Sequence, residues 1–275
     1  MPTSRRCSVS KPADPLPSRW PRLSPLAFAL TMAALALVIA SVGQVAPTPG
    51  QLVDGGPSLV RLVNRMSPPN LDPAFLTRIF WRIVETFQIA IAGAAIGIAL
   101  SLPIAWFAAR GVGPLGNVGA FLSKAFISFL RTVPDLVWAL LFVATVGLGA
   151  VAGTMTIVVD TIGFCGRFFA EAIEDSEKEP QEAISAIGGN RLSILFGAIL
   201  PEVMPSFVNT SLFALEKAVR SSVVLGLVGA GGIGQELKAA FDLFQYRNAS
   251  TIILVIFLIV LGMEWATDRL RRKVQ

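Results

Sequence analysis

The sequence contains no histidine, and it has only two cysteines, Cys7 and Cys165. Without histidine the chain cannot build a serine–histidine–aspartate triad, a histidine-ligated metal site or a histidine proton relay. Two cysteines so far apart match neither a metal-binding spacing nor a disulfide framework. We therefore expect no metal site and no cofactor.

Charged residues are also scarce, at 15% of the chain, whereas a soluble domain carries about 25%. Hydrophobic residues make up 53%, and the mean hydropathy is +0.66. A chain of this length cannot hide so much apolar surface in a water-soluble fold. The composition therefore predicts a membrane protein.

Apolar stretches of the length that a bilayer requires occur six times along the chain. The first, residues 25–42, has no charged residue and is long enough to span. A cleaved signal peptide is the rival interpretation, which we disfavour because the stretch is long for a signal core and further spans follow. The other five stretches are residues 86–109, about 133–150, about 151–170, about 203–228 and 249–266. We expect an all-α membrane protein with about six transmembrane helices.

The segments outside these stretches differ in composition. Residues 1–24 are polar and rich in proline and serine, which indicates a disordered cytoplasmic tail. Residues 43–80 contain many glycines and prolines and are expected to form an extracytoplasmic loop. Residues 121–132 have apolar residues at helical spacing and are expected to be amphipathic or partly inserted. The transmembrane core is then residues 81–272.

The basic residues are distributed unevenly between the two sides of this arrangement. With an inside N-terminus, 15 of the 23 lysines and arginines fall in the tail, in 109–132, in 167–201 and in 267–275. The excess agrees with the positive-inside rule, and the flipped orientation does not. We expect a multi-pass protein of the cell membrane with both termini in the cytoplasm. The net charge of +5 is thereby explained without nucleic acid.

A glycine-rich segment, VLGLVGAGGIGQ at residues 224–235, matches the spacing of the dinucleotide-binding fingerprint. Its context does not fit, because a long apolar helix precedes it and no acidic residue follows about 20 positions later. Glycines free the backbone to break a helix and turn close to a neighbour. We expect a turn at the outer end of the fifth span that helps to form an outer gate. Its glycines are Gly229, Gly231, Gly232 and Gly234.

The connection between the fourth and fifth spans, residues 171–201, is the most charged stretch of the chain. Most of the sequence EPQEAISAIGGNRLSILFGAILPEVMP, residues 179–205, lies within it. A short helix at about 181–187, a glycine turn and a second helix at about 191–199 would make a helical hairpin. We expect Pro201 to end this hairpin before the fifth span.

The same stretch resembles the signature of ABC importer permeases of the methionine and phosphonate type. That signature is Glu-Ala-Ala, three residues, Gly, nine residues, Ile, one residue and Leu-Pro. The chain keeps the spacing but has Ile184 in place of the second alanine and Ala198 in place of the isoleucine. Residues 131–149, 161–174 and 224–234 look like segments of phosphonate-transporter permeases, and the similarity covers roughly residues 79–272. The matching positions are Glu182, Ala183, Gly188, Leu200 and Pro201.

The resemblance implies a permease subunit that moves phosphonate or a related phosphorus oxyanion. A separate ATPase subunit would dock on the hairpin, and an extracytoplasmic binding protein would deliver the cargo. The chain has no Gly-x-x-x-x-Gly-Lys-Ser/Thr motif and is not expected to be an enzyme. Since six spans make a thin wall for a pore, we expect a second copy of the chain in the assembly. Phosphate, phosphite, methionine or another small solute stays open as the cargo, as does an ion-gradient-driven secondary transporter.

Several charged residues lie within the predicted spans, where charges usually face a cavity or a partner, and those of the fourth and fifth spans include Asp160, Glu216, Lys217 and Arg220. Glu216 and Arg220 are four residues apart on a helix and can pair. Asp160 is then the expected partner of Lys217. Two interpretations remain open: the pairs only neutralise one another, or Arg220, alone or together with Lys217, faces the pathway and passes an oxyanion.

Two further groups of residues are expected to lie at the ends of the spans. Arg131, ahead of the third span, is expected to anchor the cytoplasmic interface. Near the C-terminus, acidic and basic residues are expected to pair locally at a membrane exit; they are Glu264, Asp268, Arg269 and Arg271.

Overall fold

The computed structural model describes residues 24–46 and 49–274. Every regular element within those ranges is a helix, in agreement with the all-α prediction. The chain divides into two units, residues 1–59 and 60–275, and the boundary falls within the second helix.

The first unit contains α1 (Pro25–Val45), which coincides with the first predicted span. Ser24 caps this helix by accepting a hydrogen bond from the backbone N–H of Ala27 at 3.2 Å, and Pro25 occupies the first turn, where its missing N–H costs nothing. A window of 18 residues within it has a mean hydropathy of 2.3, and none of its 21 residues is buried. A helix that is apolar on all sides and long enough to cross a bilayer suits a lipid environment.

The prediction of a loop for residues 43–80 is wrong for most of that segment, because α2 (Pro49–Met66) is a helix and α3 begins at Pro73. Pro49 lies in the first turn of α2, which tolerates proline. The exposed apolar residues Leu59, Val60 and Val63 recur at helical spacing. This helical pattern in residues 59–66 outweighs the loop signal of the glycines and prolines.

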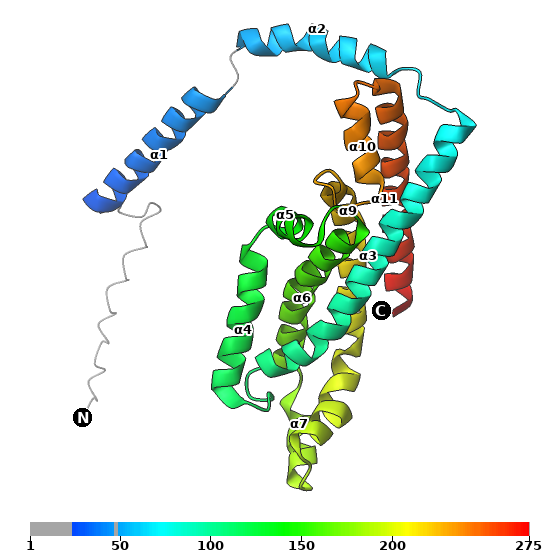
Figure 1. The fold of residues 1–275 in the computed structure, drawn as a ribbon. Coiled ribbons are helices and arrows are strands. Elements are labelled where there is room, and N and C mark those ends of the chain that lie inside the picture. The colour runs from blue at the N-terminus through cyan, green and yellow to red at the C-terminus, as the bar shows by residue number, and fades with distance from the viewer. Residues whose placement is uncertain (1–23, 47–48, 275) are drawn as a thin grey trace, which may run out of the picture. The chain divides into compact units, whose positions relative to one another are not determined.

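The second unit is a helical bundle with α3, α6 and α9 at its centre (Figure 1). The helix α6 also packs against α4 and α5, while α11 packs against α9 and α10. Glycine brings α3 and α6 close together, since a Cβ added at Gly97 would lie 2.5 Å from the Cβ of Thr161. The helices are α3 (Pro73–Ala108), α4 (Gly116–Thr132), α5 (Asp135–Val146), α6 (Ala150–Asp175), α9 (Leu200–Gly226), α10 (Ile233–Asp242) and α11 (Tyr246–Val274).

Helices long and apolar enough to cross a membrane number four in the described residues: α1, α3, residues 191–226 and α11. A fifth is obtained if α4 and α5, which are bent by 85° at residues 133–134, count as one broken span. The predicted third span is therefore different, because α5 has only 12 residues and joins α4 across this bend. The predicted fourth span is the 26-residue helix α6, which is not one of those four helices.

The segment before α9 forms α7 (Lys178–Ala186), α8 (Arg191–Ile194) and a π-helical turn, η1 (Leu195–Ile199). The prediction that Pro201 ends the hairpin is wrong, because the helix runs without a break from Arg191 to Gly226. The backbone N–H of Leu200 bonds to the carbonyl of Leu195, five residues back. This π-helical register lies directly before the proline, where an α-helical carbonyl would meet the ring.

Candidate functional site

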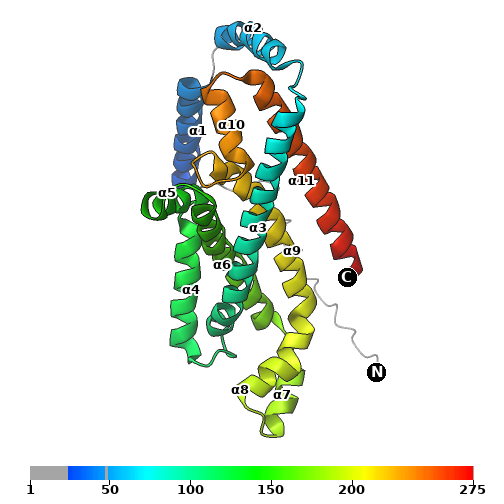
Figure 2. The ribbon, with the colours of Figure 1, turned by 45° about the vertical axis from the view of Figure 1, so that its right-hand side comes forward.

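A helical hairpin, residues 178–199, projects from one end of the bundle (Figure 2). Its turn is built as predicted: Gly188 has a φ of +83°, and its backbone N–H donates to the carbonyl of Ser185 at 3.0 Å. The N–H of Gly189 donates to the carbonyl of Ile184 at 2.9 Å. Asn190 then caps α8 by accepting from the N–H of Ser193 at 2.8 Å.

The hairpin surface is exposed and partly apolar. Glu182, Ala183 and Gly188 are exposed on α7 and its turn, Pro201 is exposed at the start of α9, and Leu200 is half-buried. Apolar side chains that the sequence analysis did not single out accompany them. They are Ile187, Leu192 and Phe196, with 84%, 49% and 63% of their surface exposed. In the sequence, each of these three apolar residues stands next to a glycine or a charged residue of a polar loop. That pattern alone does not predict an exposed apolar surface.

The inner side of the hairpin is fixed to the bundle. Ile199 is fully buried against Phe169 and Ile173 of α6. The Glu202 carboxylate accepts from the backbone N–H of Glu177 at 2.9 Å, and Arg191 donates to the carbonyl of Gly113. A force applied to the exposed tip would therefore reach α6 and α9 directly.

The glycine segment forms the predicted turn between α9 and α10. Gly229, Gly231 and Gly232 have φ of +94°, +86° and +72°. The turn is held by α6 and α3, since Gly149 donates to the carbonyl of Gly229 at 2.9 Å and Ile233 donates to the Thr86 hydroxyl at 2.8 Å. Helices flank it on both sides, as expected for a helix break and not for a dinucleotide-binding strand.

Gly234 lies beyond the turn, in the first part of α10, and it has no room for a side chain. A Cβ there would lie 1.9 Å from the carbonyl oxygen of Val223. This glycine therefore sets how closely α10 approaches α9.

The charged residues of α6 and α9 pair as expected. Lys217 lies 2.6 Å from the Asp160 carboxylate, and its ammonium also lies over the ring of Phe164. On the other side of α9, Glu216 pairs with Arg220. Glu216 is only 8% exposed, whereas 53% of the Arg220 side chain is exposed.

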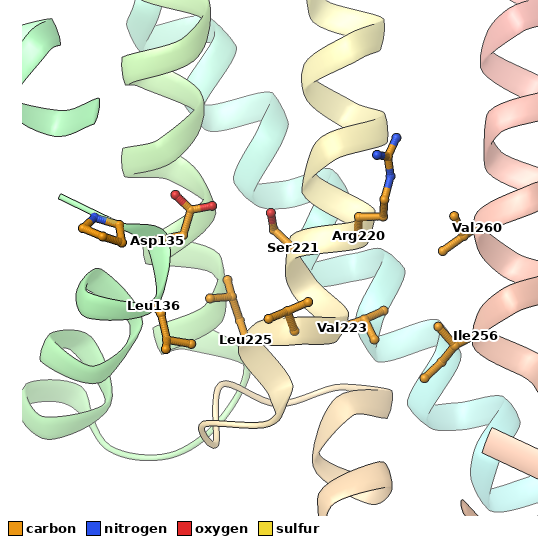
Figure 3. Close-up of a pocket in the computed structure, with 10 residues that line it drawn as sticks. Asp135, Leu136, Arg220, Ser221, Val223, Leu225, Ile256 and Val260 are labelled. Atoms are coloured by element: carbon orange, nitrogen blue, oxygen red, sulfur yellow. The ribbon is translucent and has the colours of Figure 1, made fainter. Parts of the chain in front are cut away.

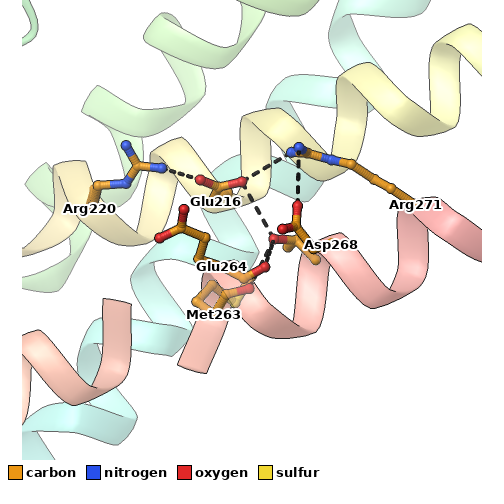
Figure 4. A network of polar contacts seen from close by, with 7 residues as sticks. Glu216, Arg220, Met263, Glu264, Asp268 and Arg271 are labelled. Atoms are coloured by element: carbon orange, nitrogen blue, oxygen red, sulfur yellow. Dashed lines mark hydrogen bonds and ion pairs between the residues drawn. The ribbon is translucent and has the colours of Figure 1, made fainter. Parts of the chain in front are cut away.

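A residue from α11 also reaches Glu216 (Figure 4). Arg271 donates to the second carboxylate oxygen at 3.0 Å, and Thr267 lies 3.4 Å from the same oxygen. The expected local pair of Arg271 with Asp268 exists, but at the longer distance of 3.9 Å. No local pattern could have found the contact with Glu216, because the two residues lie 55 positions apart.

An open cavity of about 610 Å³ lies on the face of α9 between α5 and α11 (Figure 3). Arg220 and Ser221 line it from α9, and Asp135 lines it from the first turn of α5. Lys217, Asp160 and Glu216 are not among its lining residues. Asp135 was missed by the sequence analysis, which considered only Arg131 near the start of this span. The remaining walls are mostly apolar, formed by Leu136, Val223, Val224, Leu225, Ile256 and Val260.

Residues 101–275 match the family described as binding-protein-dependent transport system inner membrane component. The chain is 39% identical over 82% of its length to the phosphate-import permease protein PhnE of Mycolicibacterium smegmatis, and it spans 42% of that longer relative. It is 36% identical over 80% of its length to the phosphite transport system permease protein PtxC of Stutzerimonas stutzeri, covering 79% of that relative.

Among solved structures, an inward-facing form of the MetNI methionine ABC transporter has a similar fold. The TM-score is 0.64 at 23% identity, over 74% of this chain and 100% of the compared chain. The family match covers more than half of the chain, and the relatives agree with the resemblance drawn from residues 179–205. The chain therefore belongs to the inner membrane permease components of binding-protein-dependent ABC importers.

Proposed function

We propose that this chain forms the membrane path by which an ABC importer moves phosphonate or a related phosphorus oxyanion into the cell. The names of the relatives support this cargo class, since they specify phosphate and phosphite import at 39% and 36% identity. The observation that carries the proposal within the structure is Arg220, a half-exposed arginine that lines an otherwise mostly apolar cavity.

The cavity favours Arg220 over Lys217 as the cation that meets the cargo. Lys217 is held by Asp160 at 2.6 Å and does not line the cavity. The planar guanidinium of arginine donates two parallel hydrogen bonds to an oxyanion, and Ser221 adds a hydroxyl beside it. A single cation lowers the barrier for an anion without holding it too tightly to be released.

The exposed tip of the hairpin is the proposed docking surface for a separate ATPase subunit. Glu182 offers a charge, Ala183 keeps the surface low enough to enter a groove, and Ile187 offers an apolar anchor. Gly188 makes the turn, while Leu200 and Pro201 begin the helix that carries the movement into the membrane. ATP hydrolysis would be the partner's reaction.

The proposed topology keeps six spans, with α6 as one of them and α4–α5 as another. The charges of α6 suit a span enclosed by other helices, because Asp160 pairs with Lys217 and Arg167 pairs with Glu171 at 2.6 Å. Both termini then lie in the cytoplasm. The hairpin faces the ATPase, and the glycine turn Gly229–Gly234 lies at the outer gate, where residues 43–80 and 229–248 would meet a solute-binding protein. A second copy of the chain would complete the pore.

Uptake in cells tests the cargo. A strain that lacks this permease and has no redundant system would be given phosphate, phosphite or an alkylphosphonate as the sole phosphorus source. We expect uptake of at least one of these to be lost and then restored by the wild-type chain. If deletion changes none of the three, the oxyanion assignment fails. Methionine uptake in the same strain tests the alternative cargo.

A secondary transporter driven by an ion gradient is the alternative from another class. Family membership disfavours it. In proteoliposomes, uptake that survives on an ion gradient without ATP would favour it instead.

A further inference from the structure

The Glu216 carboxylate is shared by two arginines that come from different helices (Figure 4). One oxygen pairs with Arg220, four residues further along α9. The other accepts from Arg271 of α11 at 3.0 Å, with the Thr267 hydroxyl 3.4 Å away. One buried anion thus holds two cations, and the three groups together carry a net positive charge.

The two arginines are held very differently. Only 19% of the Arg271 side chain is exposed, and its guanidinium lies 4.4 Å from the centre of the Phe213 ring. Arg220 is 53% exposed and lines the open cavity. Arg271 is therefore the fixed partner of Glu216, whereas Arg220 is free on its cavity side to change partner.

This difference matters when an anion enters the cavity. If Arg220 were the only partner of Glu216, an oxyanion could attract the guanidinium only by leaving a buried carboxylate unpaired. An unpaired buried charge is costly, and this cost would reduce the free energy gained when the cargo binds. With Arg271 in place, Glu216 keeps a charged partner throughout the exchange.

We propose that Arg271 is a positioning residue for cargo passage: it neutralises Glu216, so that Arg220 can exchange the carboxylate for a phosphorus oxyanion. The inference rests on the proposed role of Arg220 in the pathway. Asp268 does not replace Glu216 in this role, because it lies 3.9 Å from Arg271 and is more than half exposed. Lys217 and Asp160 form their own pair.

The test compares variants that remove one or both charges of the Arg271–Glu216 pair. They are reconstituted in proteoliposomes that contain the permease with its ATPase and binding protein. Uptake of radiolabelled phosphate, phosphite and methylphosphonate is measured at equal permease content. We expect R271Q to reduce uptake about tenfold or more, because truncating one partner of a buried charge pair strands the other. R271K should retain most of the uptake, since it keeps the charge.

The double variant R271Q/E216Q gives the decisive result. Removing the carboxylate as well releases Arg220, so uptake should recover to within about threefold of the wild type, a difference of roughly 0.65 kcal/mol at RT of about 0.59 kcal/mol. R269Q is the matched control, because Arg269 carries the same charge two residues away but lies over Trp265 at 4.8 Å. It should leave uptake unchanged.

Two outcomes would overturn the inference in distinguishable ways. If R271Q/E216Q is no better than R271Q, Arg271 only holds α11 against α9, and the proposed pathway stands without it. If R220Q takes up every cargo like the wild type, the role of Arg220 fails, and the role of Arg271 fails with it.

Discussion

Two turns at different ends of the bundle both depend on glycine, but for different reasons. In one turn a side chain would have no room, and in the other the space is open and glycine serves the positive φ of the backbone. From the end of α9 to the start of α10, three glycines are buried against backbone atoms: Gly226, Gly231 and Gly234, and a Cβ at Gly226 would lie 2.6 Å from the carbonyl oxygen of Gly231. In the hairpin, Gly188 has nothing within 4 Å of its Cβ position, and the neighbouring Ile187 is 84% exposed. The first turn is packed within the bundle, whereas the second lies on the exposed surface that we propose as the docking site of the ATPase subunit.

The comparison predicts that substitutions in the two turns have different effects. Substitutions at the buried turn should prevent the protein from folding, because the neighbouring backbone cannot move to make room for a side chain. Changes at the hairpin should leave the protein folded and in the membrane but uncouple it from ATP.

The largest effect is expected for Gly234→Ala. The added Cβ would lie 1.9 Å from the carbonyl oxygen of Val223, so α9 and α10 would have to separate. Little folded permease should be recovered after detergent extraction, as judged by size-exclusion chromatography. Gly262→Ala is the control, since its Cβ would meet nothing within 4 Å, and it should behave like the wild type. Normal recovery of Gly234→Ala would show that the turn is not fixed as described.

Glu182→Arg should abolish ATP-driven uptake while the amount of permease in the membrane stays normal. The exposed carboxylate has no contact that the fold needs, so its loss is felt only by a docked partner. Pull-down of the ATPase subunit and cargo uptake are measured together. Asp175→Arg makes the same charge change at the exposed end of α6 and should have a smaller effect on both.

Ile187→Asp should weaken ATPase docking by about tenfold, as is common when an apolar anchor of an interface is lost. Titration of the permease with the ATPase subunit in nanodiscs gives the affinity. Ile187→Leu keeps the apolar volume and should bind like the wild type. Equal affinity for the aspartate variant would place the interface elsewhere on the hairpin.

Gly188→Ala should have the smallest effect. Its φ of +83° strains an alanine by about 1 kcal/mol, but the space around it is open. We expect a modest fall in ATPase affinity and no change in folded yield. A loss of yield as severe as that of Gly234→Ala would remove the distinction between the two turns.

Local patterns predicted the local features. The spacing of Gly188 within the loop gave the hairpin turn, and the interval of four residues gave the Glu216–Arg220 pair. Helical spacing also indicated the amphipathic segment that became α4. These features depend on neighbours within one or two helical turns, which a sequence displays directly.

Two kinds of feature were missed: a contact between residues distant in the sequence, and irregular or unexpected helical segments. Arg271 meets Glu216 only because α11 returns alongside α9. The third span, predicted at about residues 133–150, is the 12-residue helix α5 joined to α4 across an 85° bend, and a π-helical turn lets the helix run through Pro201. The loop prediction for residues 43–80 rested on their glycines and prolines and missed the helical spacing of apolar residues in α2. The tail at residues 1–24 lies, except for Ser24, outside the described residues.

The most direct test of the account is the amount of phosphorus oxyanion taken up per ATP hydrolysed, in proteoliposomes with the complete transporter. For the wild type we predict uptake that requires ATP and does not occur with an ion gradient alone. For Glu182→Arg we predict that uptake falls to background while the permease remains folded in the membrane. Wild-type uptake by that variant, or uptake without ATP, would contradict the claim that the hairpin couples ATP hydrolysis to movement of the cargo.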